Sequence, residues 1–288
     1  MADGLLGEIL RLLPAMPERH APGSELYHLL KQVARREIES LFATESAMGR
    51  LGPFGDLAFP HHPMGAVSSL DLFDLDELIL FAFYWTNRQR YRRVLDIGAN
   101  LGLHAILLDR CGFEVRAFEP DPVHFALLER NLRLNRCTNV RAVNAAVSSR
   151  DGTLPFVRVL GNTTGSHLAG SKAAPYGALE TFDVPVEGIA PLVAWADLVK
   201  LDAEGHEAEI LRAAPTQAWD HTDALVEVGS AENAAALHAH FGALGVHLFA
   251  QKNGWARVHG LDDMPTSYRD GTLFVSRRAR MPWAGETA

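Results

Sequence analysis

The residues best placed to do chemistry begin in the run VLDIGANLG, residues 94–102. An apolar stretch ends there at Asp96. Gly98 and Gly102 bracket a tight turn before the apolar residues 105–107 begin a helix. Glycine at position 98 lets a ligand or another backbone approach without a clash against a Cβ atom. The helix N-terminus that follows offers free N–H groups, which suit a carboxylate or a phosphate, so the turn indicates a nucleotide site.

The spacing of this turn distinguishes between nucleotide cofactors. A dinucleotide-binding turn has the pattern G-x-G-x-x-G, in which the second glycine lets the pyrophosphate come close. Asn100 stands at that second position, so NAD is disfavoured and a nicotinamide-dependent oxidoreductase is a less favoured alternative. Glu119 lies 21 residues after Gly98, at the end of the next apolar run, where a carboxylate can bind both hydroxyls of a ribose. Pro120 stiffens the loop behind it.

These residues depend on strands and helices to bring them together. From residue 93 onward, short β-branched or apolar runs alternate with helical stretches, which is typical of parallel βαβ units. The main strands are expected at 93–97, 114–118, 139–144, 197–202, 223–228, 245–249 and 272–277. Helices are expected at 4–13, 24–42, 72–88, 101–111 and 122–135, with a turn-rich segment at 52–70. Two exposed strands, at 153–159 and 181–187, flank a loop of small polar residues at 161–177.

This alternation predicts an α/β fold with a doubly wound, mostly parallel sheet of seven strands. We expect a helical N-terminal extension at residues 1–70 and a ligand-binding domain at 71–288.

Composition narrows the classes of partner and compartment. The net charge of −8 argues against nucleic acid, because phosphate binding needs a basic face. The apolar stretch at 75–85 contains Asp76 and Glu77 and is far shorter than a membrane span, so no membrane partner is expected. The first residues carry Asp3 and Glu8 instead of the basic residues of a secretory signal, and two cysteines cannot build a disulfide framework. We therefore expect a cytoplasmic protein that acts on a small molecule.

Four motifs, taken in order, resemble one known family. VLDIGANLG is followed by FEPDPVHFALLERNLRLN, VNAAVSSRDG and KLDAEGHEAEIL. Together they are similar to the FkbM-type methyltransferases over roughly residues 75–277. The resemblance implies the class I methyltransferase fold, S-adenosylmethionine as cofactor, and methylation of hydroxyl groups of saccharides or secondary metabolites.

The resemblance also implies roles for single residues. The implied cofactor-binding residues are Asp96, Gly98, Asn100 and Gly102 in the turn, Glu119 and Pro120 at the ribose, and Asn144 and Ala146 near the adenine. The implied substrate-binding residues are Asn162 and Thr163, in the loop GNTTGSHL, and Glu227, on the strand at 223–228.

The motif KLDAEGHE places the reaction at the carboxyl edge of the sheet, where doubly wound folds bind their ligands. Methyl transfer to an alcohol needs alignment of the reacting atoms, and a general base assists because an alcohol is a poor nucleophile. Asp202, Glu204 and His206 are the candidate catalytic residues, and the sequence leaves the choice among them open. Asp202, Glu204 and Glu227 also have the oxygen ligands that Mg²⁺ prefers. A metal is not favoured, because acids at one edge are as often helix caps and cofactor ligands.

Two further readings concern the whole chain. A methyltransferase fold that has lost activity and serves as a binding protein is the alternative to an enzyme, although the intact cofactor motifs argue against it. In the extension, residues 5–13 and 26–33 carry apolar faces at helical spacing. We expect these helices to form a lid over the substrate pocket or the surface of a homodimer.

Overall fold

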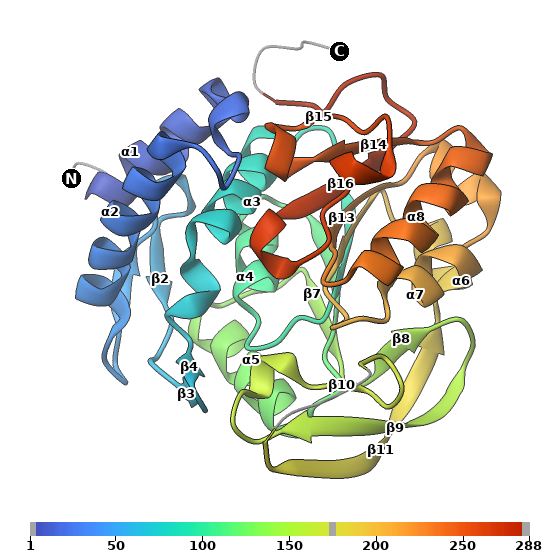
Figure 1. Ribbon diagram of the computed structural model, residues 1–288. Helices are drawn as coiled ribbons and strands as arrows, with labels where there is room; N and C mark the ends of the chain where they lie inside the picture. Colours follow the sequence, from blue (N-terminus) through green and yellow to red (C-terminus); the bar gives the residue numbers. More distant parts are fainter. Residues whose placement is uncertain (1–3, 173–176, 284–288) are drawn as a thin grey trace.

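The computed structural model describes residues 4–172 and 177–283. Within these ranges the central sheet has eight strands, in the order β7 (Val140–Val143), β6 (Glu114–Phe118), β5 (Arg93–Ile97), β12 (Leu198–Leu201), β13 (Asp223–Glu227), β16 (Thr272–Ser276), β14 (His247–Ala250) and β15 (Ala256–Arg257). The strands from β7 to β13 are parallel. β16 lies antiparallel between β13 and β14 (Figure 1). This is the class I methyltransferase fold that the motifs predicted.

The prediction of seven strands was one too few. The eighth, β15, is a two-residue strand that pairs only with the end of β14. Two residues carry no periodic pattern, so the sequence could not show it.

Helices cover both faces of the sheet. On one face lie α3 (Leu75–Thr86), α4 (Leu103–Arg110) and α5 (Pro122–Leu134), and on the other α6 (Ile189–Trp195), α7 (Glu207–Ala213) and α8 (Ala231–Leu244) (Figure 1). Successive strand residues point to opposite faces, so Val94 of β5 lies in the first core and Leu95 in the second. α3 begins three residues later than predicted, because residues 71–73 form a 3₁₀ turn and Asp74 caps the helix by accepting from the N–H of Leu75.

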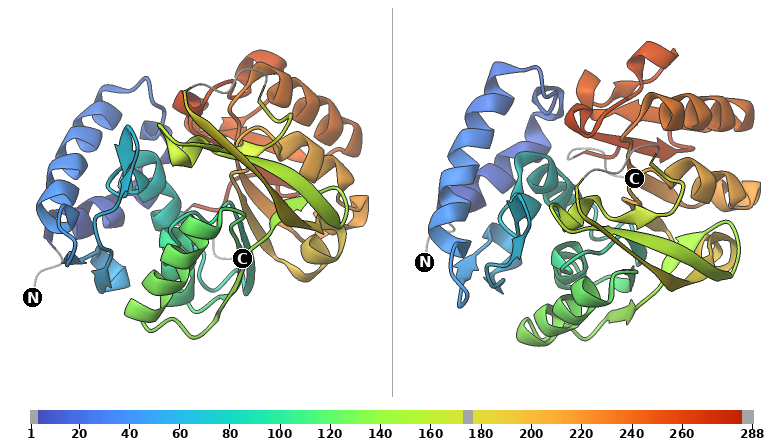
Figure 2. Two further views of the ribbon diagram at one scale, coloured as in Figure 1. Left: turned by 90° about the horizontal axis from the view of Figure 1, so that it is seen from below. Right: turned by 60° about the horizontal axis from the view of Figure 1, so that its bottom comes forward.

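The N-terminal residues form an outer layer on the α3 side of the sheet, seen in blue in Figures 1 and 2. α1 (Gly4–Leu12) and α2 (Glu25–Phe42) match the predicted helices. Ser24 caps α2 by accepting from the N–H of Tyr27 at 3.1 Å. Two small hairpins that the sequence did not reveal lie in and just before the segment predicted to be turn-rich: β1 (Met48–Arg50) with β2 (Asp56–Ala58), and β3 (Pro63–Met64) with β4 (Val67–Ser68).

A second, smaller sheet is inserted between β7 and α6. In the described residues it has four strands, in the order β10 (His167–Leu168), β9 (Gly152–Val159), β11 (Leu179–Gly188) and β8 (Ala146–Ser148). Both predicted exposed strands are present as β9 and β11. Part of the predicted loop is a 3₁₀ turn at 163–165 followed by β10, while residues 173–176 of that loop lie outside the described residues. Figure 2 shows this inserted sheet crossing in front of the central sheet.

None of the helices in the described part of the chain is both long enough and apolar enough to cross a lipid bilayer.

Candidate active site

Two neighbouring cavities open at the carboxyl edge of the parallel strands. The first encloses about 600 Å³ of space, its open mouth included. Its walls come from the turn after β5, the loop after β6, the residues after β7 and the inserted sheet. The topology thus brings the separate sequence motifs together in one place.

The glycine turn needs its glycine for a backbone contact. Gly98 has φ +77°, and a Cβ atom at this position would lie 1.8 Å from the carbonyl oxygen of Asp202. Gly98 and Asn100 line the first cavity, whereas Gly102 packs against Leu128 of α5 and does not. Asn100 has φ +50°, and no donor among the described residues reaches its buried Oδ1. This amide is therefore available to a ligand.

Glu119 lies where the sequence motif predicted a ribose-binding carboxylate. Its side chain is buried in the wall of the first cavity, and the two oxygens accept from the N–H groups of Asn100 and Asp121, each at 2.8 Å. Burial raises the pKa of Glu119 to about 8, against the effect of these two hydrogen bonds. Hydroxyl donors from a ligand would compensate this burial.

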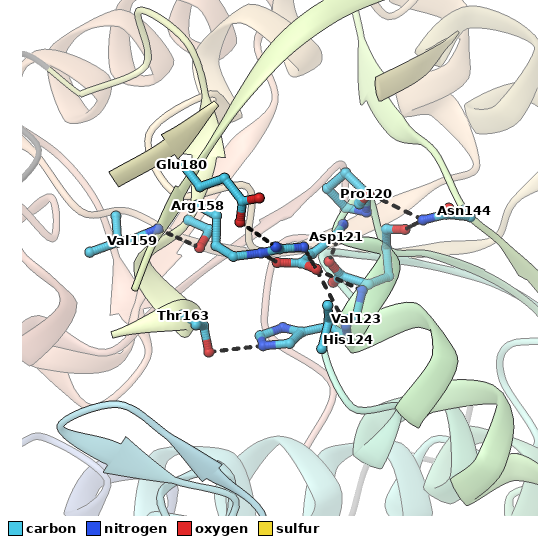
Figure 3. Close-up of polar contacts among 11 residues, drawn as sticks. Pro120, Asp121, Val123, His124, Asn144, Arg158, Val159, Thr163 and Glu180 are labelled. Atoms are coloured by element: carbon cyan, nitrogen blue, oxygen red, sulfur yellow. Dashed lines mark hydrogen bonds and ion pairs between the residues drawn. The ribbon is translucent and has the colours of Figure 1, made fainter. Parts of the chain in front are cut away.

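Asn144 has a different neighbourhood from the one implied by the family resemblance. Its Nδ2 donates to the carbonyl oxygens of Glu119 at 2.8 Å and Pro120 at 3.1 Å (Figure 3). The amide therefore holds the Glu119 loop in place. Pro120 and Ala146 are in the described lining of the first cavity, and Asn144 is not.

Asp96 lies beneath the cavities, fully buried and outside both linings as far as the structure describes them. Its carboxylate lies 3.6 Å from Nζ of Lys200, which donates to the carbonyl oxygen of Gly98 at 3.0 Å. Nζ also lies 3.9 Å from Oδ2 of Asp202. Burial alone would lower the pKa of Lys200, but the carboxylates of Asp96 and Asp202 raise it above its ordinary value. A permanent positive charge thus lies directly behind Asp202.

The three candidate bases have unequal surroundings. The side chain of Asp202 is 30% exposed and lines both cavities. Glu204, with φ +51°, forms an ion pair with Nζ of Lys172 and accepts from the hydroxyl of Tyr268 at 2.9 Å. Burial and the charge of Asp202 raise the pKa of Glu204 to about 7, against the effect of Lys172.

His206 is held away from the cavities by both ring nitrogens. Nε2 lies 2.8 Å from Oγ of Ser148 and Nδ1 lies 3.2 Å from Oγ of Ser171. It is absent from both cavity linings in the described part of the chain. Glu207, next to it, accepts from the N–H groups of Ala203 and Gly205 and so fixes the turn that carries Asp202. His206 thus has no access to the cavities as described, whereas Asp202 lines both of them and Glu204 lines the first.

The second cavity, of about 710 Å³ with its mouth, adjoins the first at Asp202. Its lining is dominated by carboxyl groups: Asp71, Asp74, Asp76, Glu77, Asp202 and Glu227. Glu227 comes from the neighbouring strand β13, as predicted. Burial raises its pKa well above the ordinary value, and so do the charge of Asp202 and a hydrogen bond with Asp202. Its surroundings therefore favour the protonated form of Glu227 beside Asp202.

Of the two predicted substrate residues of the inserted loop, Thr163 alone is in the described lining of the first cavity. Thr163 lines the first cavity, where its Oγ1 lies 2.9 Å from Nε2 of His124 (Figure 3). Oδ1 of Asn162 accepts from the hydroxyl of Thr164, and the backbone of Asn162 forms a β-bridge with Gly65. Both residues thus lie on the side of Glu119, away from the second cavity, which we call the acidic cavity after its carboxyl groups.

Sequence reasoning missed several residues of these cavities. His124 follows the FEPDP motif directly and could have been found there, since it lies in the first turn of α5. Lys172, Glu77 and Tyr268 had no local signal, because their contacts with the site join parts of the chain far apart in sequence. In the part of the chain that is described, no three His, Cys, Asp or Glu side chains are arranged to hold a metal ion.

Comparison with known proteins identifies relatives of this chain. The family described as "Methyltransferase FkbM domain" matches residues 96–241, just over half of the chain. The methyltransferase sdnD of Sordaria araneosa is 29% identical over 160 residues, which cover 44% of this chain and 62% of that protein. Methyltransferase 1 of Beauveria bassiana is 26% identical over 155 residues, which cover 46% of this chain and 62% of that protein. The chain thus spans about three fifths of the length of these curated relatives.

Among solved structures, the precorrin-6y C5,15-methyltransferase of Geobacter metallireducens is 13% identical, with a TM-score of 0.40. The match covers 74% of this chain and 96% of that one. The family match begins at Asp96 in the glycine turn, includes Glu119 and Asp202, and extends into α8. On this match the chain belongs to the FkbM methyltransferase family, which confirms the resemblance of its motifs.

Proposed function

We propose that this chain is an S-adenosylmethionine-dependent methyltransferase that methylates a hydroxyl group of a small molecule, a saccharide or a secondary metabolite. The observation that carries the proposal is the position of Asp202, whose side chain lines both cavities. A carboxylate at that junction can reach a nucleophile held in the second cavity and an electrophile held in the first. In this proposal the first cavity binds the cofactor and the second binds the acceptor.

The first cavity has the chemistry that S-adenosylmethionine requires. Glu119 offers its carboxyl oxygens to the ribose hydroxyls, and Asn100 offers a buried amide oxygen without a partner among the described residues. Apolar side chains, including Phe118, Val147 and Phe156, supply a wall for the adenine ring. The bound cofactor would supply a methyl group made electrophilic by its sulfonium.

Asp202 would act as the general base. Glu204 is engaged by Lys172 and Tyr268, and His206 by two serine hydroxyls. Asp202 has the Lys200 ammonium 3.9 Å away and the carboxyl of Glu227 beside it, and its charge also acts on Glu204. While the methyl group would leave the sulfur of the cofactor for the acceptor oxygen, with the thioether as the leaving group, Asp202 would take the proton of the acceptor hydroxyl and release it to solvent.

The acidic cavity favours hydroxylated acceptors. Carboxylates accept hydrogen bonds from hydroxyl groups, and several of them converge there with only Lys200 as a cation in the described lining. Two of the acids, Asp71 and Asp74, form ion pairs with Arg35 and Lys31 of α2. The remaining negative charge would repel an acceptor that carries a carboxylate or phosphate. We therefore propose a neutral polyhydroxylated acceptor.

The direct test is a search for an acceptor by release of S-adenosylhomocysteine. The purified chain is incubated with S-adenosylmethionine and with pairs of compounds, each a glycoside or secondary alcohol and its deoxy or carboxylate counterpart. Turnover with the hydroxylated member, with the new methyl group on oxygen by mass spectrometry and NMR, supports the proposal. Methylation of nitrogen or carbon would overturn the O-methylation. Tight cofactor binding without turnover on a broad panel would favour the inactive binding protein.

A further inference from the structure

A buried ion pair joins the inserted sheet to the start of α5. Arg158 of β9 donates from Nε and Nη2 to the two carboxylate oxygens of Asp121, each at 2.6 Å (Figure 3). The Asp121 side chain is 1% exposed and that of Arg158 is 12% exposed. A two-pronged contact of this kind fixes orientation as well as distance. It therefore determines how the insert lies against the loop after β6.

Asp121 links this ion pair to Glu119. Its backbone N–H donates to Oε1 of Glu119 at 2.8 Å, while its side chain holds Arg158. Burial would raise the pKa of Asp121, but the hydrogen bond from Arg158 keeps it below the ordinary value, so the carboxylate is charged. Removing the guanidinium would leave the charged carboxylate without its cation, with only the N–H groups of Val123 and His124 at the start of α5 as donors, so Asp121 would move or admit water. Any such movement shifts the N–H that holds Glu119.

A second contact lies beside the ion pair. Nε2 of His124, in the first turn of α5, lies 2.9 Å from Oγ1 of Thr163, the first residue of the 3₁₀ turn of the insert (Figure 3). Burial lowers the pKa of His124 to about 4, so the ring is neutral near pH 7 and this is a contact between uncharged groups. Asp121, His124 and Thr163 all line the first cavity. The contacts that attach the insert are therefore themselves walls of that cavity.

We propose that Arg158 is a positioning residue for the cofactor: by holding Asp121 it fixes the Glu119 loop and the wall that the insert contributes to the adenosine end of the first cavity. The proposal rests on the proposed function, since it assumes that the first cavity binds S-adenosylmethionine. It makes attachment of the insert part of cofactor binding and separates these residues from recognition of the acceptor.

The test measures binding of S-adenosylhomocysteine and of methylthioadenosine, which lacks the amino-acid portion, by calorimetry. Arg158→Gln is expected to raise the Kd of both by at least about tenfold, because one partner of a buried charge pair is lost. Arg158→Lys, which keeps the charge but not the two parallel donors, should lie between wild type and Arg158→Gln. Glu180→Gln is the matched control. It removes the other ion pair of Arg158, to a half-exposed carboxylate, and should leave both Kd values within about twofold.

Thr163→Val tests the neighbouring contact with little risk to folding. It should weaken binding of both ligands in the same direction as Arg158→Gln. The midpoint of thermal unfolding is measured for each variant, and binding is measured well below that temperature. If Arg158→Gln folds and binds both ligands as tightly as wild type, the insert is merely structural and the inference is wrong. If Arg158→Gln does not fold, the same result for Thr163→Val overturns the inference. Absence of binding by the wild-type chain would instead overturn the proposed function.

Discussion

At the scale of single residues, the geometry separates three side chains that the motif KLDAEGHE presents as equals. Both ring nitrogens of His206 are engaged, by Ser148 and Ser171. Oε2 of Glu204 is engaged by Lys172 and Tyr268. Asp202 alone among the three lines both cavities in the described structure. The proposed role of Asp202 as general base has a direct kinetic consequence.

Asp202→Asn should lower turnover by about 10²–10⁴-fold, because the amide cannot take the acceptor proton. Binding of S-adenosylhomocysteine should change little, since the variant keeps the size of the side chain. The measurement compares turnover, on an acceptor found by the paired screen, with calorimetric Kd. Glu204→Gln is the comparison variant and should retain more turnover than Asp202→Asn. An equal or larger loss in Glu204→Gln would contradict the assignment of the base.

Glu227→Gln should change the pH dependence of stability. The folded-state pKa of Glu227 is raised well above 4.5, so the native state keeps a proton that the unfolded state releases. The stabilisation by the protonated carboxyl is complete below pH 4.5 and is lost as pH rises toward the folded pKa, by up to about 1.4 kcal/mol per pH unit. Glutamine does not titrate, so the variant should gain on wild type between pH 5 and pH 8 in urea unfolding. A constant difference over this range would show that Glu227 is not held protonated.

The sequence predicted the residues whose partners are close in sequence or joined by a strong motif. Glu119 and Asn100 belong to two successive βα turns of a known pattern. In the structure the N–H of Asn100 donates to Oε2 of Glu119 at 2.8 Å. Tyr268 and Lys172 could not be predicted, because they reach Glu204 from a C-terminal turn and from the insert. Asn162 and Thr163 were predicted for the substrate from composition and resemblance, which cannot show the cavity a side chain enters.

At the scale of elements, the site depends on how closely the turns after β5 and β12 approach each other. The strands themselves were predicted to within a residue or two, because their apolar runs are bounded by turn residues. Their contact was not predictable from either run alone. The structure shows it: a Cβ atom added at Gly98 would lie 1.8 Å from the carbonyl oxygen of Asp202.

Gly98→Ala should therefore cost much more stability than alanine at another left-handed glycine. Gly112, after α4, has φ +85° and no atom within 4 Å of an added Cβ, so it carries only the conformational cost. We expect about 1 kcal/mol for Gly112→Ala and at least about 3 kcal/mol, or failure to fold, for Gly98→Ala. Chemical unfolding of both variants measures the difference. Similar losses would mean that the two turns can separate without cost.

At the scale of the whole molecule, the N-terminal layer is continuous with the catalytic core. Leu6 and Ile9 of α1 belong to the same buried cluster as Leu78 of α3 and Ile106 of α4. The sequence predicted the helices, but it did not show whether their apolar faces pack within this chain or against a second copy. The division of the chain at residue 70 and a homodimer through these helices stay predictions, the second to be checked by sedimentation equilibrium.

Leu6→Ala should destabilise the entire chain by about 2–5 kcal/mol, because it opens a cavity in the shared core. Leu5→Ala, one residue away with a side chain 45% exposed, should cost at most about 0.5 kcal/mol. Thermal unfolding followed by calorimetry should show one transition that moves as a whole in Leu6→Ala. A separate early transition would indicate that the extension unfolds independently.

Calorimetric titration with S-adenosylhomocysteine tests the central claim most directly, because it needs no acceptor. The account predicts saturable binding at one site per chain, lost in Glu119→Ala, with no binding of NADH. Binding unaffected by Glu119→Ala, no binding by the wild-type chain, or binding of NADH in its place would contradict it.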